Sequence, residues 1–223
     1  MSARDAILNR VRNALKPGAS EAERRRLVDE RLTAAPNGVI PARGQLPEQE
    51  RVALFCTMAQ KIAATIERVG KADDVPKAVT QYLRAKNLPA SVRMGADGRL
   101  AAMPWAKQRS LTVKSGPSDG DDEVGVSHAL GGVAETGTVV MESGPANPTT
   151  INFLPEHHIV VVDAKDVAGD LEAVLERVRR AYGKGEMPRT LNLISGPSRS
   201  GDIEQKIILG AHGPRALHLI VVG

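Results

Sequence analysis

The chain has 223 residues, enough to bury one hydrophobic core, and its 42% hydrophobic and 25% charged residues are typical of a globular protein. A single cysteine, Cys56, excludes an intramolecular disulfide and a cysteine-ligated iron–sulfur cluster within this chain, because a cluster normally needs four thiolates. The N-terminus has no apolar signal region, and no run approaches the ~18 apolar residues of a membrane helix, so we expect a cytoplasmic protein without a membrane span.

The charge is unevenly divided along the chain. Residues 1–114 hold 21 Lys and Arg against 11 Asp and Glu, whereas residues 115–223 hold 9 against 15. A basic half could meet nucleic acid, but aromatic residues for stacking and zinc-finger or RNA-binding signatures are missing. We therefore expect no nucleic-acid partner, and favour docking of the basic half onto an acidic partner or onto the acidic half itself.

Helical patterns dominate the first part of the chain. Residues 3–16 predict a short amphipathic helix, and residues 20–34 predict a second, charged helix that is capped by Ser20 and has a thin apolar face. Residues 35–44 are rich in helix breakers and predict a linker. Apolar residues at helical spacing predict one long helix over Pro47–Val69, with Cys56 in an inert core position. We divide the chain into a helical arm and linker over 1–46 and an α/β domain over 47–223.

A helix capped by Asp73 or Asp74, with Pro76 in its first turn, leads into the strand-rich remainder. There, one helix is predicted over 167–182, and apolar runs predict strands at 90–94, 111–113, 158–163, 191–194 and 217–222. Residues 124–141 predict a buried strand, a small-residue turn or short helix, a Glu-Thr-Gly loop and a second buried strand. Continuous apolar strands that alternate with helices favour a mostly parallel sheet covered on both faces, hence a three-layer α/β sandwich plus an N-terminal helical region.

The run Leu191–Ile194 leads into a loop of glycine, proline and serine that ends at Asp202. We expect Asp202 to cap a following helix, so that loop amides, hydroxyls and Arg199 would hold a carboxylate or phosphate at the helix N-terminus. Asp202 stands where a phosphate loop requires Lys, so this is not a nucleoside-triphosphatase loop. A tight turn whose serines only satisfy their own backbone is the alternative.

Ligands of such sheets bind beyond the carboxyl ends of the strands. We therefore expect the Glu135-Thr136-Gly137 loop, residues 195–202 and residues 212–214 to meet there. The small residues around Gly131 and Gly137 would either pack elements closely or admit a ligand.

Three motifs together resemble the LUD domain family over about residues 110–223. They are Ala134-Glu135-Thr136-Gly137-Thr138, the run Leu154–Val162 with Pro-Glu-His-His, and Ile194–Glu204 followed by Gly210-Ala211-His212-Gly213-Pro214. Ser200-Gly201 stands where Thr-Ala is more usual, a mild departure that affects the expected hydrogen bonding of the loop.

The resemblance implies a fold like that of sugar-phosphate isomerases and coenzyme A transferases. It also implies a role in oxidising L-lactate to pyruvate, as one subunit of a three-component system. The iron–sulfur clusters would then lie in the partner subunits, and we predict no cofactor in this chain.

Two residues are candidates for chemistry. Glu135 could act as a base or nucleophile, or could organise its loop through backbone N–H groups. His212 could remove the lactate hydroxyl proton, or could be a turn histidine bonded to the backbone.

The other candidate residues are predicted to bind the ligand. Arg199 is the best anion ligand, and a surface ion pair with Asp202 or Glu204 is its alternative. The spacing of His128, His157, His158 and His212 does not predict a metal site, and Ser195 and Ser198 lack the frame of a serine nucleophile. The predicted ligand-binding residues are Thr136, Gly137, Ser195, Gly196, Ser198, Arg199 and Asp202.

Three hypotheses follow from the sequence. The chain is a non-cluster subunit of a lactate-oxidising complex, or a regulatory or assembly module that senses a small carboxylate or phosphate, or an independent transferase or isomerase acting on a phosphorylated or coenzyme A substrate.

Overall fold

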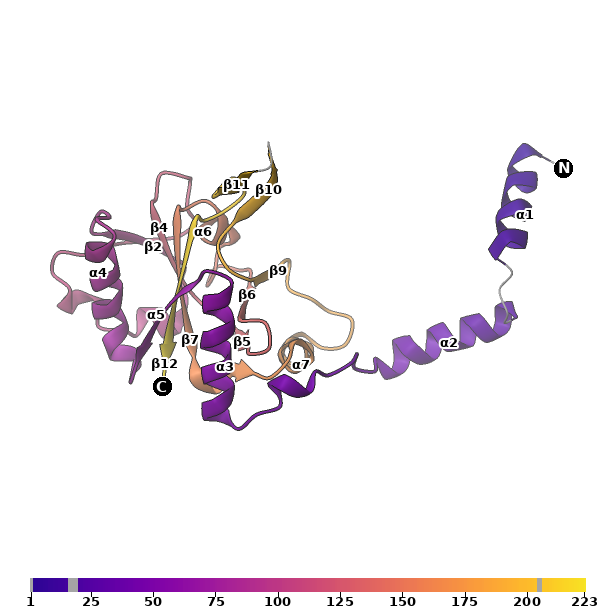
Figure 1. The fold of residues 1–223 in the computed structure, drawn as a ribbon, viewed down its shortest axis with the longest axis horizontal. Helices are drawn as coiled ribbons and strands as arrows, with labels where there is room; N and C mark the ends of the chain where they lie inside the picture. The colour runs from indigo at the N-terminus through magenta and orange to yellow at the C-terminus, as the bar shows by residue number, and fades with distance from the viewer. Residues whose placement is uncertain (1, 16–19, 204–205) are drawn as a thin grey trace. The chain divides into compact units, whose positions relative to one another are not determined.

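The computed structural model describes residues 2–15, 20–203 and 206–223, in two units, Met1–Val39 and Ile40–Gly223 (Figure 1). The helices are α1 Ala3–Leu15, α2 Glu21–Ala34, α3 Glu48–Lys61, α4 Val75–Ala85, α5 Gly98–Ala101, α6 Thr149–Phe153 and α7 Leu171–Tyr182. The strands are β1 Thr65–Val69, β2 Ser91–Met94, β3 Thr112–Ser115, β4 Val124–His128, β5 Gly131–Val133, β6 Thr138–Glu142, β7 His157–Asp163, β8 Val167–Ala168, β9 Leu191–Ile194, β10 Arg199–Ile203, β11 Lys206–Leu209 and β12 Ala216–Val222.

The first unit contains the two predicted helices, α1 and α2. Ser20 caps α2, because its hydroxyl accepts a hydrogen bond from the backbone N–H of Glu23 at 3.2 Å. Neither helix has a buried residue. The N-terminal helical prediction is therefore confirmed for both segments.

A six-stranded sheet of order β1-β12-β7-β4-β2-β3 forms the centre of the second unit, and all its neighbouring pairs are parallel. Residues 159–162 of the central strand β7 are all apolar because successive residues face two different cores. Val160 and Val162 pack with α3, whereas Ile159 and Val161 pack with α4. The α/β prediction, with a mostly parallel sheet covered on both faces, is confirmed.

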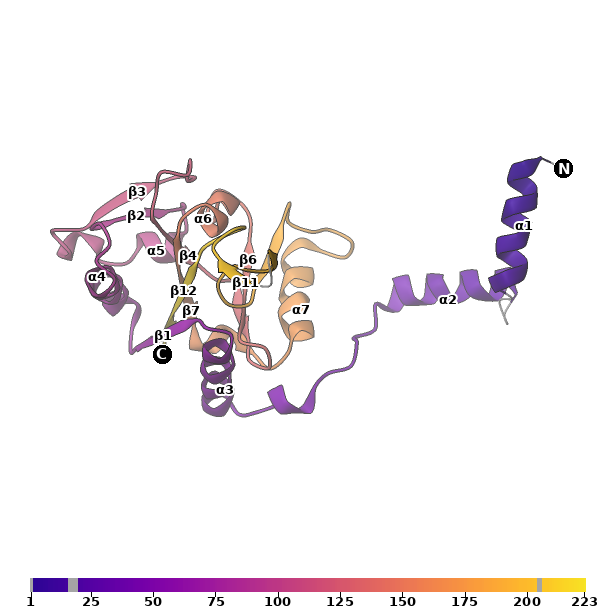
Figure 2. The ribbon, with the colours of Figure 1, turned by 45° about the horizontal axis from the view of Figure 1, so that its top comes forward.

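A second sheet of order β8-β5-β6-β9 lies on the α3 side of the main sheet (Figure 2). Val139 and Met141 of β6 share the core of α3, whereas Val133 and Val140 face Val174 of α7 on the outer side. This mixed sheet adds to the predicted layers. In it the small residues Gly131–Val133 form a strand instead of the expected turn or short helix.

The predicted long helix over 47–69 is wrong in its last third. Helix α3 ends at Lys61, Ala63 takes a left-handed conformation (φ 67°), and Thr65–Val69 forms β1, parallel to β12. Ile66 and Val69 continue the helical spacing, but these β-branched residues are also favourable in a strand, and pairing with β12 decides between the two.

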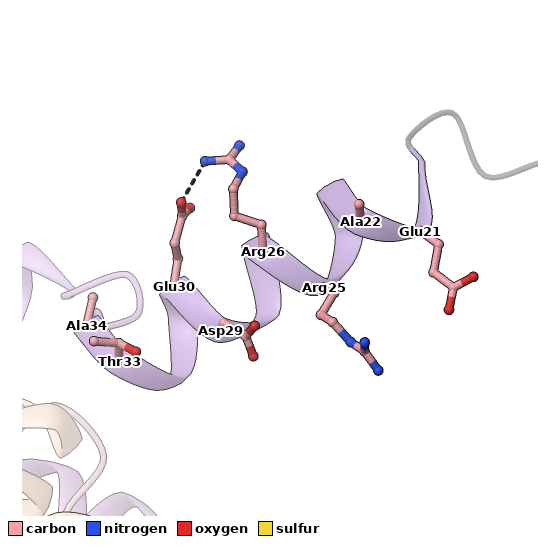
Figure 3. Close-up of a pocket in the computed structure, with 8 residues that line it drawn as sticks. All are labelled: Glu21, Ala22, Arg25, Arg26, Asp29, Glu30, Thr33 and Ala34. Carbon is pink, nitrogen blue, oxygen red and sulfur yellow. Dashed lines mark hydrogen bonds and ion pairs between the residues drawn. The ribbon is translucent and has the colours of Figure 1, made fainter.

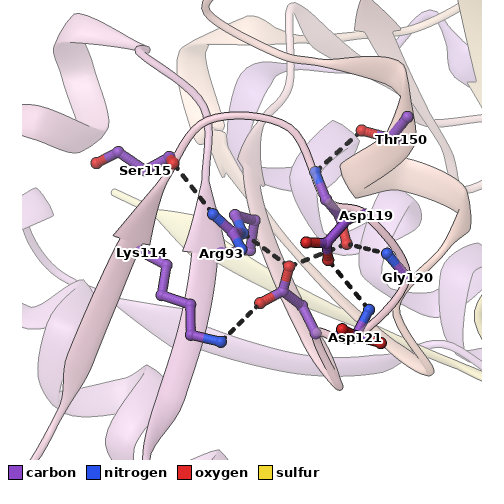
Figure 4. A network of polar contacts seen from close by, with 9 residues as sticks. Arg93, Lys114, Ser115, Asp119, Gly120, Asp121 and Thr150 are labelled. Carbon is purple, nitrogen blue, oxygen red and sulfur yellow. Dashed lines mark hydrogen bonds and ion pairs between the residues drawn. The ribbon is translucent and has the colours of Figure 1, made fainter.

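Loop 118–122 is held against β2 and β3 by a polar network around the buried carboxylate of Asp122 (Figure 4). Nε of Arg93 donates to it at 2.7 Å, Nζ of Lys114 at 3.2 Å and the Ser118 hydroxyl at 3.0 Å. Burial would raise the pKa of Asp122, but these hydrogen bonds and the Arg93 charge keep it below its ordinary value.

In the part of the chain that the structure describes, no helix has both the length and the apolar character needed to cross a membrane.

Candidate functional site

Two loops meet at the edge of the main sheet where β7 and β12 begin, beside α6 and the β10–β11 hairpin (Figure 1). The backbone N–H of Ser198 donates to the carbonyl of Pro214 at 2.8 Å, and the Ser198 hydroxyl accepts from the backbone N–H of His212 at 3.3 Å. Ser198 therefore fastens the loop after β9 to the loop before β12.

These loops enclose a cavity of about 410 Å³, which we call the amino-edge cavity. Its size falls within the usual range of small-molecule sites. The cavity is lined by Asn152, Phe153, His158, Leu193, Ile194, Ser195, Gly196, Pro197, Ser198, Arg199, His212, Gly213, Pro214 and Leu217. Ser195, Gly196, Ser198, Arg199 and His212, all predicted from the sequence, are thus brought together.

Two side chains that sequence reasoning missed form the floor of this cavity. Asn152 of α6 and His158 of β7 are each 1% exposed. Among the described residues, Nδ2 of Asn152 and Nδ1 of His158 have no hydrogen-bond partner. An unpartnered buried polar group costs about 1–3 kcal/mol, so the floor favours a ligand that supplies the missing partners.

Arg199 stands at the rim and is exposed to solvent. The structure gives its guanidinium one long hydrogen bond, from NH2 to the carbonyl of Ile62 at 3.5 Å. The side chain of Asp202 and all of Glu204 lie outside the described residues, so the alternative of an ion pair with either is not tested.

A chain of hydroxyls connects two of the predicted motifs. Oγ1 of Thr138 lies 2.7 Å from Oγ1 of Thr136 and 2.6 Å from Oγ of Ser195. Thr136 therefore does not line the cavity and is connected to the lining residue Ser195 through Thr138.

The two predicted glycines pack closely against α3 and the turn that follows it. Gly137 (φ 68°) lies so near α3 that a Cβ there would come within 2.2 Å of the Ala59 nitrogen, and a Cβ on Gly196 (φ 77°) would come within 2.3 Å of the Ile62 oxygen. Close packing explains both glycines in this structure.

Glu135 does not line the amino-edge cavity. Its carboxylate lies 3.7 Å from Nε of Arg43, and its backbone N–H donates to the carbonyl of Gly169 at 3.3 Å. The structure thus separates the two residues predicted for chemistry, Glu135 and His212.

Three structural expectations for this region are wrong. Residues 199–203 form β10, which pairs with β11 in an antiparallel hairpin, so Asp202 lies in a strand and caps no helix. The strand Leu191–Ile194 exists, but it is partly exposed and runs antiparallel to β6 in the second sheet. The predicted loops also meet where β7 and β12 begin, and not beyond the carboxyl ends of the strands.

A second cavity, of about 280 Å³, does lie at the carboxyl ends, where Asp97 follows β2 and His128 ends β4. We call it the carboxyl-edge cavity. Arg99 holds Asp97 through Nε at 3.1 Å and NH2 at 2.7 Å, and Nδ1 of His128 donates to the Ala129 carbonyl at 3.0 Å. Burial lowers the pKa of His128 and raises that of Glu142, which the Tyr182 hydroxyl contacts.

The carboxyl-edge cavity could also be predicted from the sequence. Asp97 and His128 each stand at or just after a predicted strand, where ligand-binding side chains are expected in parallel sheets.

A large hollow along α2 is lined by residues of that one helix, Glu21 to Ala34 (Figure 3). Its charged side chains include the exposed pair Arg26–Glu30 at 2.6 Å. A hollow bounded by one helix face encloses no ligand, so we do not treat it as a functional site.

Within residues 2–15, 20–203 and 206–223, no three His, Cys, Asp or Glu side chains gather into a group that could hold a metal ion.

The solved structures include one of the same fold. The crystal structure of a DUF162 family protein from Deinococcus radiodurans matches with a TM-score of 0.60 at 19% sequence identity, over 80% of this chain and 99% of that chain.

Sequence comparison identifies relatives of the second unit. The LUD domain family profile matches residues 119–222. Lactate utilization protein C of Shouchella clausii is 32% identical over 100 residues, which are 45% of this chain and 44% of that protein. The same-named protein of Geobacillus thermodenitrificans is 36% identical over 100 residues, 44% of this chain and 42% of that protein.

The match therefore spans less than half the length of these proteins. The uncharacterized protein YkgG of Escherichia coli is 28% identical over 99% of both chains. The matched profile contains the motifs around Glu135, His158 and Ser195, so residues 119–222 of this chain are similar to the LUD domain family and resemble lactate utilization protein C.

Proposed function

We propose that this protein is a component of a lactate-utilization system and that its amino-edge cavity binds a small carboxylate. One observation carries the proposal: Ser195, Ser198, Arg199 and His212, from two separate loops, line one cavity. The proposed role in lactate utilization rests on the name of the relatives, lactate utilization protein C.

The chemistry of the lining supports a carboxylate ligand. The guanidinium of Arg199 can donate two parallel hydrogen bonds to a carboxylate, and serine hydroxyls can add others. Leu193, Ile194 and Leu217 offer apolar contact for a small alkyl group such as a methyl. Lactate would fill only part of about 410 Å³, which leaves space for a group borne by a partner.

The lactate oxidation itself requires an electron acceptor. The single cysteine of this chain cannot ligate an iron–sulfur cluster, so in this proposal partner subunits carry the clusters and this chain holds the substrate. A regulatory or assembly module would use the same cavity to sense the carboxylate without taking part in turnover.

The carboxyl-edge cavity favours a second candidate function, that of an independent transferase or isomerase. Buried His128 and partly buried Glu142, the latter with a pKa raised by desolvation, are suited to proton transfer or nucleophilic attack, and both line a cavity where parallel sheets place their active sites. In that case Glu142 takes the role that the sequence suggested for Glu135.

The test is lactate-dependent dye reduction by the purified protein, alone and with the two candidate iron–sulfur partners. We compare the wild type with Arg199→Ala, with Arg99→Ala in the carboxyl-edge cavity, and with the control Arg215→Ala. Arg215 is exposed, pairs with Glu156 at 3.2 Å and does not line the amino-edge cavity.

Activity that needs the partners, falls in Arg199→Ala and survives in Arg215→Ala is the expected result. Activity that survives Arg199→Ala leaves an assembly role. Lactate-dependent dye reduction by the protein alone contradicts the subunit proposal.

A further inference from the structure

A hydrogen-bond chain of three buried residues contains both floor residues of the amino-edge cavity. The hydroxyl of Ser127, on β4, donates to Oδ1 of Asn152 at 3.2 Å, and its Oγ lies 3.0 Å from Nε2 of His158. Ser127 is 3% exposed, and Asn152 and His158 are each 1% exposed. The three residues come from β4, α6 and β7, so only the folded chain brings them together.

The direction of this chain fixes the tautomer of His158. An amide oxygen only accepts, so Ser127 gives its single hydroxyl proton to Asn152. Its oxygen must then accept from His158, which places the ring proton on Nε2. Burial lowers the pKa of His158 to about 3, so the ring is neutral at physiological pH and Nδ1 carries a lone pair.

One acceptor and one donor of this chain are left without partners among the described residues. The acceptor is Nδ1 of His158, and the donor is the Nδ2 amide of Asn152. Both side chains line the amino-edge cavity, so a ligand that reaches its floor contacts them, and it reaches the two covered atoms once these side chains move toward it. The combination requires a ligand with a hydrogen-bond donor close to an acceptor.

We propose that these two groups select a 2-hydroxy carboxylate. Its hydroxyl donates to Nδ1 of His158, and its carboxylate accepts from Nδ2 of Asn152 and from Arg199. The inference rests on the proposed carboxylate site and adds recognition of the hydroxyl, with His158 and Asn152 as the residues that determine specificity.

The same chemistry disfavours close analogues of the ligand. A 2-oxo acid such as pyruvate presents only acceptors, and propionate has no oxygen at the second carbon, so Nδ1 of His158 stays unpaired with either. Both floor atoms are covered by their neighbours in the structure, so the ligand has to draw the two side chains toward itself. Only a ligand that forms hydrogen bonds with both groups fully offsets the free-energy cost of that movement.

The experiment is calorimetric titration of the full-length protein with L-lactate, propionate and pyruvate, followed by long-range 1H–15N NMR of the histidine rings. We expect L-lactate to bind about tenfold or more tightly than either analogue, the usual effect of one hydrogen bond to a buried group. The spectrum should show the His158 proton on Nε2, and L-lactate alone should shift its Nδ1 resonance.

Variants test whether the amide of Asn152 donates a hydrogen bond to the ligand. Asn152→Asp keeps the acceptor for Ser127 but replaces the amide by a negative charge, so it should abolish binding of all three acids. The matched control His157→Gln changes a buried neighbour whose Nδ1 pairs with the Tyr82 hydroxyl at 2.9 Å and which does not line the cavity. This control should bind as the wild type does. If Asn152→Asp does not fold, the ligand series and the ring spectrum of the wild type still decide the question.

The outcomes separate the two proposals. Equal binding of the three acids, or a His158 proton on Nδ1, overturns the hydroxyl recognition and leaves the carboxylate site standing. Failure of all three acids to bind overturns the carboxylate site and this inference with it.

Discussion

The hydroxyl of Thr138 lies 2.6 Å from the hydroxyl of Ser195, although the two residues are 57 positions apart in the chain. Thr138 begins β6, directly after the Glu-Thr-Gly turn, and Ser195 follows β9 and lines the amino-edge cavity. Strands β6 and β9 are antiparallel neighbours, so this contact ties the turn to the cavity wall. Two motifs of the LUD domain thus form one structural unit.

Thr138→Val removes that hydroxyl with little change in shape. We expect the free energy of unfolding to fall by about 1 kcal/mol, since Ser195 loses its partner. Carboxylate affinity should fall several-fold as the loop loosens. Urea denaturation and calorimetric titration measure the two effects. Thr136→Val, at the exposed end of the hydroxyl chain, is the control, and a Thr138→Val protein that matches the wild type in both measurements would contradict this role.

Gly137→Ala and Gly196→Ala should each lower the free energy of unfolding by at least about 2 kcal/mol. Both glycines have positive φ, and a Cβ would come within 2.2 Å of Ala59 or 2.3 Å of Ile62. Gly70→Ala serves as control, because a Cβ there meets nothing within 4 Å and its φ is not positive. Urea midpoints of the three variants provide the comparison, and equal midpoints would show that the loops are not held against α3.

Asp122→Ala should destabilise the protein by about 3 kcal/mol. The carboxylate is buried between Arg93 and Lys114, and its removal leaves the Arg93 guanidinium, 16% exposed, without its partner. The neighbouring exposed Asp121→Ala is the matched control and should be close to neutral. Thermal unfolding followed by circular dichroism distinguishes them, and an unchanged midpoint for Asp122→Ala would show that the network is not important for stability.

The stability of the protein should fall as the pH drops below 6.5. Burial lowers the pKa of His158 to about 3 and that of His218 to about 4, from an ordinary value of 6.5. Below pH 6.5 the unfolded chain therefore binds protons that the folded chain does not, and each histidine reduces the free energy of unfolding by about 1.4 kcal/mol per pH unit. Above pH 6.5 the two histidines cause no change.

Urea denaturation between pH 7.5 and 4.5 measures this slope, in a range above the ordinary carboxyl pKa values. His218→Gln should reduce the slope by the share of this one ring, about 1.4 kcal/mol per pH unit. Constant stability across this range would mean that the two buried rings accept protons in the folded state.

Local sequence patterns were sufficient to predict those helices and strands whose tertiary contacts agree with the intrinsic preference of their residues. Helices α1, α2, α4 and α7 and the strands β2, β4, β7 and β12 lie close to their predicted positions. The apolar runs of β7 and β12 predicted strands buried on both faces, which requires a parallel sheet with a layer on either side. The motifs around Glu135, His158 and Ser195 predicted the LUD domain family.

Long-range pairing decided the elements that were misjudged. Thr65–Val69 and Gly131–Val133 become strands because β12, β6 and β8 offer them hydrogen-bond partners, and such pairing cannot be read from local spacing. The predicted helix after Asp202 is replaced by the β10–β11 hairpin for the same reason. With that helix, the predicted helix-terminus anion site is also lost.

The sequence by itself determined the α/β class and most of the residues that line the amino-edge cavity, because periodicity, turn residues and motifs are local properties. Only the tertiary structure decided that this cavity lies where β7 and β12 begin, that Glu135 lies outside it, and that Asn152 and His158 form its floor. These results depend on contacts between α6, β4 and β7, whose buried hydrogen bonds leave one donor and one acceptor unpaired. Which donor and which acceptor stay unpaired depends on three-dimensional packing, so local sequence patterns do not predict it.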